Sequence, residues 1–161
     1  MTGQQRPKDE AVIQQFGPMV YRLAFAQTRS QADADDVYQE VFLRYVEKAP
    51  AFHSGDHAKA WFLRVTINCC NDLWRSPWRR RSAPLTEDLP FETREELGLH
   101  QELLKLPKKY RAVLHLFYWE DMTTAEIAQV LDLKPAAVRQ RLTRARAMLR
   151  ELLEEEDLLH V

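Results

Sequence analysis

Hydrophobic residues in the last third of the chain recur at the spacing of one helical face. They lie at i, i+4, i+7, i+11 and i+14 of a single stripe, namely Val138, Leu142, Ala145, Leu149 and Leu152. Polar side chains occupy most of the remaining positions, so we expect a helix that packs through one face and leaves the other exposed. Pro135 suits the first turn of this helix, where the N–H that proline lacks has no intrahelical partner.

A shorter helix is predicted immediately before it, across a tight turn. Thr123, with Glu126 three residues later, forms a capping box, which marks a helix start. Ile127, Val130 and Leu131 then give this helix an apolar face that can pack against the next one. Two short helices around a turn are the arrangement of a helix-turn-helix, whose second helix enters the major groove of DNA.

The second helix of this motif is uniformly basic. Between Lys134 and Arg150 the chain carries six positive residues and no negative one. A helix face that is merely solvated usually mixes charges of both signs, as i,i+4 ion pairs require. The charge pattern therefore favours contact with DNA over a solvated surface.

Three helical patterns occupy the first half of the chain. They cover residues 9–28, 31–48 and about 58–75, with a loop at 51–57. Gly17-Pro18 inside the first pattern predicts a kink or an interruption. The residues expected to form the three apolar faces are, in turn, Val12, Ile13, Phe16, Val20 and Leu23; Tyr38, Val41, Phe42 and Tyr45; and Ala58, Trp61, Phe62, Val65, Cys69 and Leu73.

A polar stripe runs along the third of these helices. Its members recur at the helical period and carry hydrogen-bond donors: Arg64, Asn68, Asn71 and Arg75. Such a stripe suits a phosphate backbone or unstacked bases, but an ordinary solvated face has the same pattern. The residues alone leave both interpretations open.

Residues 77–96 differ from the segments on either side. They contain Pro77, Pro84 and Pro90, mixed charges and little periodicity, which is typical of a linker. A second helical block follows from about residue 95, and with the helix-turn-helix it contains four helices. Its first two helices are predicted from Leu99, Leu103, Leu104 and Leu106 and, after Pro107, from Tyr110, Val113, Leu114, Phe117 and Tyr118.

Composition agrees with an all-α fold of two small helical domains joined by a flexible linker. The 161 residues include only four glycines, and 45% are hydrophobic. No apolar stretch is long enough to span a membrane, and the polar N-terminus lacks the apolar core of a signal peptide, so we expect a cytoplasmic protein. The net charge of −1 conceals acidic and basic clusters that lie in different segments.

The residues give little support for catalysis or metal binding. Cys69 and Cys70 are adjacent on a predicted helix, where neighbouring side chains diverge by about 100° and rarely form a disulfide. We therefore interpret them as core residues. No CxxC motif, nucleophile triad or phosphate-binding loop occurs. We expect neither an enzyme nor a cofactor.

Five motifs along the chain, in their order and spacing, resemble one family. They begin at Asp33, Ala60, Leu106, Tyr118 and Val138 and read DADDVYQEVFLRYV, AWFLRVTIN, LPKKYRAVL, YWEDMTTAEIA and VRQRLTRAR. Together they are similar to the extracytoplasmic-function (ECF) group of the sigma-70 family of bacterial RNA polymerase sigma factors. The resemblance covers about residues 10–153 and implies a transcription initiation factor that binds core polymerase and promoter DNA.

The resemblance implies a division of the chain into three parts. Residues 1–76 would form region 2, which binds core polymerase and recognises and melts the downstream promoter element. Residues 77–96 would be the linker, and residues 97–161 would form region 4, a helix-turn-helix domain with an acidic tail that binds the upstream element. Region 2 would dock its acidic helix on a coiled coil of the largest polymerase subunit through Asp35, Asp36, Gln39, Glu40 and Phe42.

The resemblance also implies two DNA-contacting surfaces. In region 2 the loop before the third helix would capture a flipped base, and that helix would contact phosphates. The matching residues are Phe52, His53, Lys59, Arg64, Asn68, Asn71 and Arg75. In region 4 the recognition helix would read the major groove through Lys134, Ala137, Arg139, Gln140, Arg141 and Arg144. Family members often carry Gly and Thr or Ser where this chain has Ala136 and Ala137, so the exact base code does not follow from the family.

Three other functions compete with this prediction. A stand-alone dimeric repressor or activator could use the same helix-turn-helix, but it would leave the acidic helix and the third helix without a role. A protein-interaction adapter that has lost DNA binding would not need Arg139, Arg141 and Arg144. An enzyme is the least favoured of the three.

The resemblance implies one more partner. An anti-sigma factor is common for the resembled group.

Overall fold

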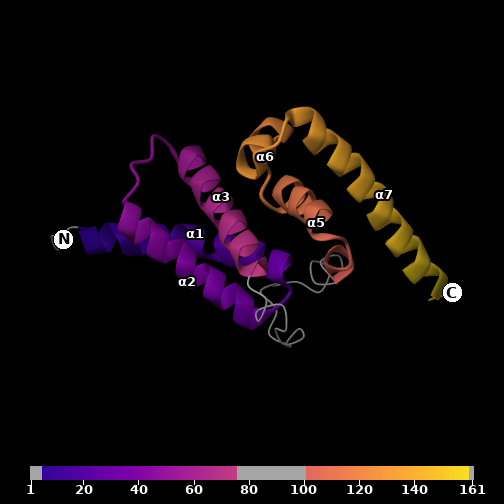
Figure 1. The fold of residues 1–161 in the computed structure, drawn as a ribbon, viewed down its shortest axis with the longest axis horizontal. Helices are drawn as coiled ribbons and strands as arrows, with labels where there is room; N and C mark the ends of the chain where they lie inside the picture. The colour runs from indigo at the N-terminus through magenta and orange to yellow at the C-terminus, as the bar shows by residue number, and fades with distance from the viewer. Residues whose placement is uncertain (1–4, 76–100, 160–161) are drawn as a thin grey trace. The chain divides into compact units, whose positions relative to one another are not determined.

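The computed structural model describes residues 5–75 and 101–159 (Figure 1). The chain divides into two compact units, Met1–Asp88 and Leu89–Val161. Every regular element in the described residues is a helix, which confirms the predicted all-α fold. The predicted linker at 77–96 and the predicted core residue Leu99 lie outside the described residues.

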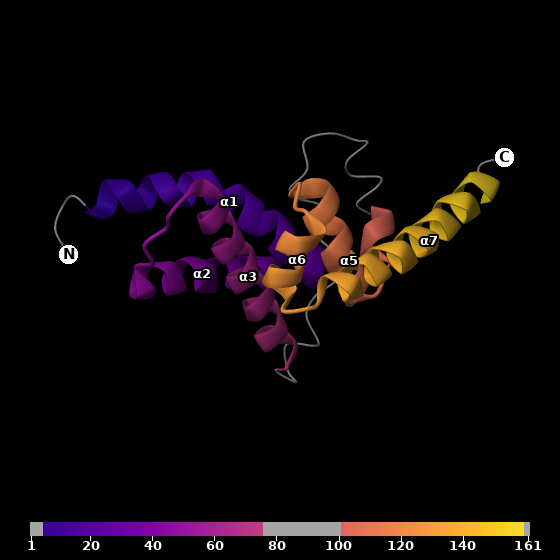
Figure 2. The same cartoon turned by 90° about the horizontal axis from the view of Figure 1, so that it is seen from above.

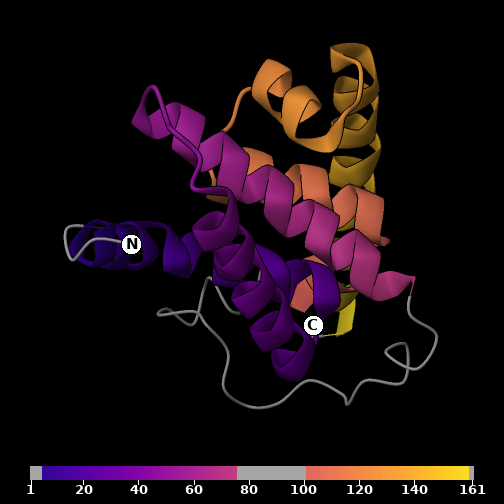
Figure 3. The same ribbon diagram turned by 60° about the vertical axis from the view of Figure 1, so that its left-hand side comes forward.

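The N-terminal unit is built from three long helices. These are α1 (Gln5–Thr28), α2 (Gln31–Lys48) and α3 (Gly55–Trp74), and each contacts the other two. Figures 2 and 3 show α3 lying across the α1–α2 pair. Their apolar faces meet in one core, whose largest fully buried side chains include Leu23, Phe25, Phe62 and Leu63.

Of the kink or interruption predicted at Gly17-Pro18, the interruption does not occur, because helix α1 is continuous through both residues. Gly17 is buried, and a Cβ at this position would lie 3.0 Å from the hydroxyl oxygen of Tyr38 on α2. The lack of a side chain therefore permits a close approach between the two helices. Burial also extends beyond the predicted stripe to Met19, Ala24, Phe25 and Ala26, because α1 packs against both α2 and α3.

Helix α2 has the predicted bounds and is capped at both ends. The Ser30 hydroxyl accepts a hydrogen bond from the Asp33 N–H at 3.3 Å, which satisfies a donor of the first turn. Ala49 adopts a left-handed conformation with φ 43° and donates to the Tyr45 carbonyl, and Pro50 follows it. The helix therefore starts and stops where its sequence predicts.

Helix α3 starts three residues earlier than predicted. Ser54 is its N-cap, and the Ser54 hydroxyl accepts a hydrogen bond from the His57 N–H at 3.1 Å. Residues 55–57 consequently belong to the first helical turn and not to the loop. The buried face of α3 is also wider than predicted, since it includes Leu63, Thr66, Ile67 and Cys70, whereas Trp61, Val65 and Leu73 are half-buried.

The C-terminal unit contains four helical segments in the part of the chain that the structure describes. Residues 101–104 are helical, and α5 (Lys108–Leu114) runs directly into a π-helical turn, η2 (His115–Trp119). Helices α6 (Thr124–Leu131) and α7 (Pro135–Leu159) follow. Helix α7 packs against both α5 and α6, and the fully buried side chains of the unit include Leu103, Leu114, Leu116, Ile127 and Leu142.

The π turn changes which residues of the α5–η2 helix are buried. The pattern predicts Phe117 and Tyr118 on the apolar face, but Phe117 is half-buried and Tyr118 is 52% exposed. His115 and Leu116 are buried instead. A π turn closes with i→i+5 hydrogen bonds, so residues after it are displaced around the axis from their α-helical positions. The prediction assumed an unbroken 3.6-residue period.

The helix-turn-helix is confirmed, including its capping chemistry. Thr123 and Glu126 form the reciprocal capping box at the start of α6, with hydrogen bonds of 2.9 and 3.1 Å. Asp132 ends α6 in a left-handed conformation, with φ 55°. Pro135 then begins α7 as predicted.

Helix α7 is longer than the basic segment alone. Val138, Leu142 and Ala145 of the predicted stripe are buried, and Leu149 and Leu152 are half-buried. The helix continues to residue 159, so the exposed Glu151, Glu154 and Glu155 lie on the same helix as the arginines. The acidic tail predicted from the sequence thus begins on α7 itself.

Candidate nucleic-acid interface

The predicted base-reading residues lie on α7 and on the turn before it. Lys134, Arg139, Gln140 and Arg144 are exposed, and Ala137 and Arg141 are half-buried. We call these six residues the reading face. The buried Val138, Leu142 and Ala145 lie on the opposite side of α7 and anchor the helix to the core. A single α-helix with one polar, basic side fits the major groove, which is about 12 Å wide.

A further arginine of α7 is committed to a contact within the unit. The Nε of Arg146 donates to the Tyr118 hydroxyl at 2.8 Å. Its guanidinium carbon also lies 5.2 Å from the ring centroid of Phe117 and 5.7 Å from that of Tyr118. Arg146 therefore ties η2 to α7, with cation–π attraction adding to the hydrogen bond.

An exposed ridge runs along α2 and carries most of the predicted polymerase contacts. Asp35 and Gln39 lie one turn apart and are exposed, Asp36 is exposed beside them, and Glu40 is half-buried. Leu43 continues the ridge one turn beyond Gln39. Four of the five predicted polymerase contacts therefore lie on one accessible surface.

Phe42 is the exception among those five residues. It is only 7% exposed, and its ring centroid lies 4.8 Å from that of Tyr38 and 5.4 Å from that of Phe62. Its place is in the aromatic core between α2 and α3. The structure thus separates Phe42 from the surface that its neighbours form.

Two apolar residues of the ridge are absent from the sequence prediction. Leu43 is 52% exposed and Val46 is 41% exposed. The buried stripe of α2, with Val41 and Tyr45, leaves these two side chains on another side of the helix. Exposed apolar groups beside carboxylates suit a partner surface that offers both apolar and basic groups.

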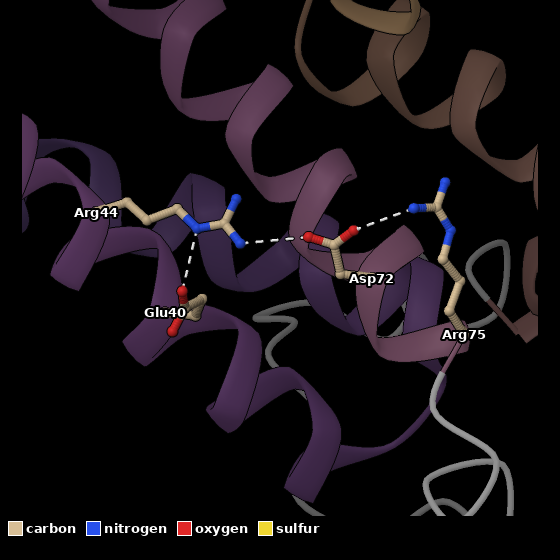
Figure 4. A network of polar contacts seen from close by, with 4 residues as sticks. All are labelled: Glu40, Arg44, Asp72 and Arg75. Atoms are coloured by element: carbon tan, nitrogen blue, oxygen red, sulfur yellow. Dashed lines mark hydrogen bonds and ion pairs between the residues drawn. The ribbon is translucent and has the colours of Figure 1, made fainter.

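Four charged residues connect α2 to α3 (Figure 4). Arg44 donates from Nε to Glu40 Oε1 at 3.1 Å and from Nη2 to Asp72 Oδ2 at 3.3 Å. The Nη1 of Arg75 lies 3.7 Å from Asp72 Oδ1. Burial opposes the charge of Arg44, but its hydrogen bonds to Glu40 and Asp72 outweigh that cost and raise the pKa of the guanidinium. The network joins a predicted polymerase contact, Glu40, to a predicted DNA contact, Arg75.

The predicted downstream DNA contacts come from α3 and from the loop before it. His53, Arg64, Asn68 and Arg75 are exposed, and Phe52, Lys59 and Asn71 are half-buried. Phe52 packs against Tyr45, Trp61 and Phe62, with ring centroids 6.5, 5.8 and 5.9 Å away. Phe52 therefore supports the loop, and the exposed His53, Arg64 and Asn68 lie at the surface of the unit.

Both cysteines are buried free thiols, as their interpretation as core residues predicts. Burial raises the pKa of the Cys69 thiol to about 11, with Arg44 opposing the shift and Glu40 and Asp72 adding to it. A thiol with this pKa stays protonated at neutral pH and is a poor nucleophile.

Neither a metal cluster nor a membrane span is found among the described residues. No group of three or more His, Cys, Asp or Glu side chains there could hold a metal ion. None of the helices described has the length and apolar character needed to cross a bilayer.

Comparison with known proteins links both units to one family. Residues 12–80 match the family model for sigma-70 region 2, and residues 96–149 match the model for sigma-70 region 4. The first match contains α2, α3 and the loop between them, and the second contains the helix-turn-helix.

Individual relatives agree with these matches. The chain is 34% identical over 134 residues to the RNA polymerase sigma-E factor of Streptomyces avermitilis, covering 78% of this chain and 74% of that protein. It is 32% identical over an alignment of 164 positions to the ECF RNA polymerase sigma factor SigE of Mycolicibacterium smegmatis, covering 94% of this chain and 63% of that protein. The solved structure of CnrH in complex with the cytosolic domain of CnrY is similar with a TM-score of 0.68 and 28% identity, covering 95% of this chain and 91% of that one. The chain therefore belongs to the ECF group of the sigma-70 family of RNA polymerase sigma factors.

Proposed function

We propose that this sigma factor reads a bipartite promoter with two separate surfaces. Region 2, at residues 1–76, captures the melted downstream element, and region 4, at residues 97–161, reads the upstream element in the major groove. Residues 77–96 join them, and core polymerase holds both at the correct spacing. Protein and DNA thus meet at two places, and neither region alone selects a promoter.

The observation that carries this proposal is the reading face of α7. Its exposed members carry cationic or amide side chains, and the helix is fixed from behind by the buried Val138, Leu142 and Ala145. Arginine can contact guanine through two hydrogen bonds, and glutamine can contact adenine in the same way. Arg139, Gln140 and Arg144 are the members best suited to base edges, because they are exposed within the first three turns of the helix.

The donor stripe of α3 supports the downstream half of the proposal. Arg64, Asn68 and Arg75 are exposed at helical spacing, so they can follow a strand of phosphates along one side of α3. Flipping a base out of the duplex costs a few kcal/mol. Phosphate contacts and a loop that receives the base can offset that cost.

The ridge of α2 supports docking on core polymerase. Asp35, Asp36 and Gln39 present polar and negative groups next to the exposed Leu43 and Val46. A basic surface with an apolar patch would match this ridge in both charge and hydrophobicity. Docking through α2 would leave the donor stripe of α3 for DNA.

An anti-sigma factor is a further proposed partner. CnrH, whose structure is similar, was solved in complex with the cytosolic domain of CnrY. A protein that covers the ridge of α2 or the reading face of α7 would block polymerase or promoter binding. Co-purification with a candidate partner, followed by loss of transcription on its addition, tests this part of the proposal.

The central experiment is transcription by the chain reconstituted with purified core polymerase on genomic fragments. We expect promoter-specific transcripts whose start sites define one bipartite sequence motif. Arg144→Ala should reduce use of the upstream element while core binding is preserved, and Asp35→Arg should weaken core binding itself. Arg150→Ala removes the same charge from α7 outside the reading face and is the matched control for Arg144→Ala.

Two results would oppose the proposal. If no genomic fragment yields a specific transcript, the chain does not act as an initiation factor. If it binds an operator tightly without polymerase, with strong salt dependence, a stand-alone regulator using the same helix-turn-helix is favoured instead.

A further inference from the structure

Two exposed imidazole rings, one from the loop before α3 and one from the first turn of α3, stack on each other. The ring centroids of His53 and His57 are 5.1 Å apart with an interplanar angle of 12°. Phe52 meets the His57 ring edge-on, with centroids 5.5 Å apart at 87°. Phe52 is itself held by Tyr45, Trp61 and Phe62, so the imidazole pair rests on a packed aromatic base.

Hydrogen bonds hold His57 in one orientation. Its backbone N–H donates to the Ser54 hydroxyl at 3.1 Å, as part of the cap of α3. Its ring Nδ1 accepts a hydrogen bond from the backbone N–H of His53 at 3.1 Å. The ring is thus fixed by one contact at its backbone, one at Nδ1 and two at its aromatic surface.

The contact at Nδ1 sets the tautomer of the ring in this arrangement. A backbone N–H can only donate, so Nδ1 of His57 must carry a lone pair, and the neutral ring must carry its proton on Nε2. Within residues 5–75 and 101–159, no hydrogen bond engages that Nε2. His57 therefore presents an oriented Nε2–H donor on the exposed first turn of α3.

We propose that His57 is a specificity-determining residue of the downstream site, where its Nε2–H donates to an acceptor atom on the edge of the captured base. This inference rests on the proposed function, because it names the residue that reads the base in a site which that function requires. A phosphate would be bound better by a cation such as Arg64 or Lys59, whereas the planar Nε2–H donor of His57 suits a base edge. The stacked His53 ring adds a flat surface beside the base, which serves any base equally.

Three substitutions at His57 separate its possible contributions. His57→Gln keeps an N–H donor near the position of Nε2. His57→Asn keeps an acceptor for the His53 N–H but has no donor at that position. His57→Phe keeps a flat ring but lacks both the donor at the Nε2 position and the acceptor for the His53 N–H. His53→Ala removes the stacked ring and leaves the backbone N–H that sets the tautomer.

The test uses holoenzyme assembled from core polymerase and the full chain. The probes are promoter fragments with a single-stranded downstream element, carrying each of the four bases or an abasic residue at each position in turn. Competition between fragments gives the base preference. For wild type we expect one position with a preference of about five-fold or more, the value of one hydrogen bond of about 1 kcal/mol.

His57→Phe and His57→Asn should abolish this preference, and His57→Gln should keep part of it. His53→Ala should weaken binding of all bases alike and keep their ranking. If His57→Phe retains the wild-type preference, or if His57→Gln loses as much as His57→Phe, His57 does not read the base. Specific transcription by these same variants would show that the proposed function stands although this inference fails.

Discussion

The Nε of Arg146 donates to the hydroxyl of Tyr118 at 2.8 Å, across 28 residues of sequence. This contact connects the π turn to the middle of α7. It also divides the arginines of α7 into two kinds, because Arg144 is exposed on the reading face while Arg146 is engaged with two aromatic rings. Charge alone does not distinguish these two residues.

Arg146→Ala should destabilise the protein more than it weakens DNA binding. It removes one hydrogen bond and two cation–π contacts at a surface site, so we expect the free energy of unfolding to fall by about 1 kcal/mol. Affinity of the holoenzyme for upstream DNA should fall no further than in Arg150→Ala, which loses the same charge. Urea denaturation and promoter binding measure the two effects. A loss of affinity as large as that of Arg144→Ala would instead assign Arg146 to the DNA contact.

Leu43→Asp should weaken core polymerase binding and Phe42→Ala should lower stability, although the two residues are adjacent. Leu43 is 52% exposed, so Leu43→Asp should change the free energy of unfolding by less than about 0.5 kcal/mol and weaken core polymerase binding about ten-fold or more. Phe42 is buried among aromatic rings, so Phe42→Ala should cost about 3–5 kcal/mol of stability. Thermal unfolding and a core-binding titration measure both. Unchanged core binding in a folded Leu43→Asp protein would show that Leu43 does not contact core polymerase.

Arg44 and Asp72 should show a small, salt-sensitive coupling. Their ion pair is partly exposed, so a double-mutant cycle with Arg44→Ala and Asp72→Ala should give a coupling energy of about 0.2–1 kcal/mol. The coupling should shrink as salt is raised from 0.05 to about 1 M, where the Debye length is about 3 Å. Denaturant unfolding at the two salt concentrations measures it. A coupling that does not change with salt would show that packing, and not charge, joins α2 to α3 here.

Cys69 should make the protein less stable at alkaline pH. Its pKa is about 11 in the folded chain and near 9 in the unfolded one, so the folded state holds the thiol proton more tightly. Stability from this group is fully present below pH 9 and falls as the pH rises towards 11. The stability advantage of wild type over Cys69→Ala should shrink by about 1–2 kcal/mol over that interval. Urea unfolding at several pH values measures the difference, and a constant difference would contradict the buried-thiol explanation.

Local chemistry explains the parts of the fold that could be predicted from sequence. Helix α2 is bounded by Ser30 and by the residues before Pro50, and α6 by the Thr123–Glu126 capping box, so each limit is encoded within a few residues. The stripe on α7 is equally local, because helical geometry alone brings its members together. These features are independent of what the helices pack against.

Features that depend on distant residues could not be predicted in the same way. The Arg44–Asp72 pair joins residues 28 positions apart, and its existence depends on how α2 packs on α3. The exposure of Leu43 likewise follows from which side of α2 meets its neighbours, whereas the burial of Phe42 agrees with the apolar face that the spacing of α2 predicts. The earlier start of α3 is a different case, since Ser54 followed by Asp56 is a recognisable cap. The orientation of the His57 ring could not be predicted in this way, because it depends on both the cap of α3 and the geometry of the loop before it.

The π turn at His115–Trp119 has a consequence for how the family varies. Residues on either side of it are out of phase by one position, so deleting one of the residues His115–Phe117 would let the segment close into a regular α-helix. Tyr118 would then rotate by about 100° around the helix axis and lose its place opposite Arg146. In an alignment of homologous chains, the loss of this contact would correspond to a one-residue gap, while the tyrosine and the arginine would both be unchanged. A contact between two helices can thus be gained or lost through the length of the chain alone.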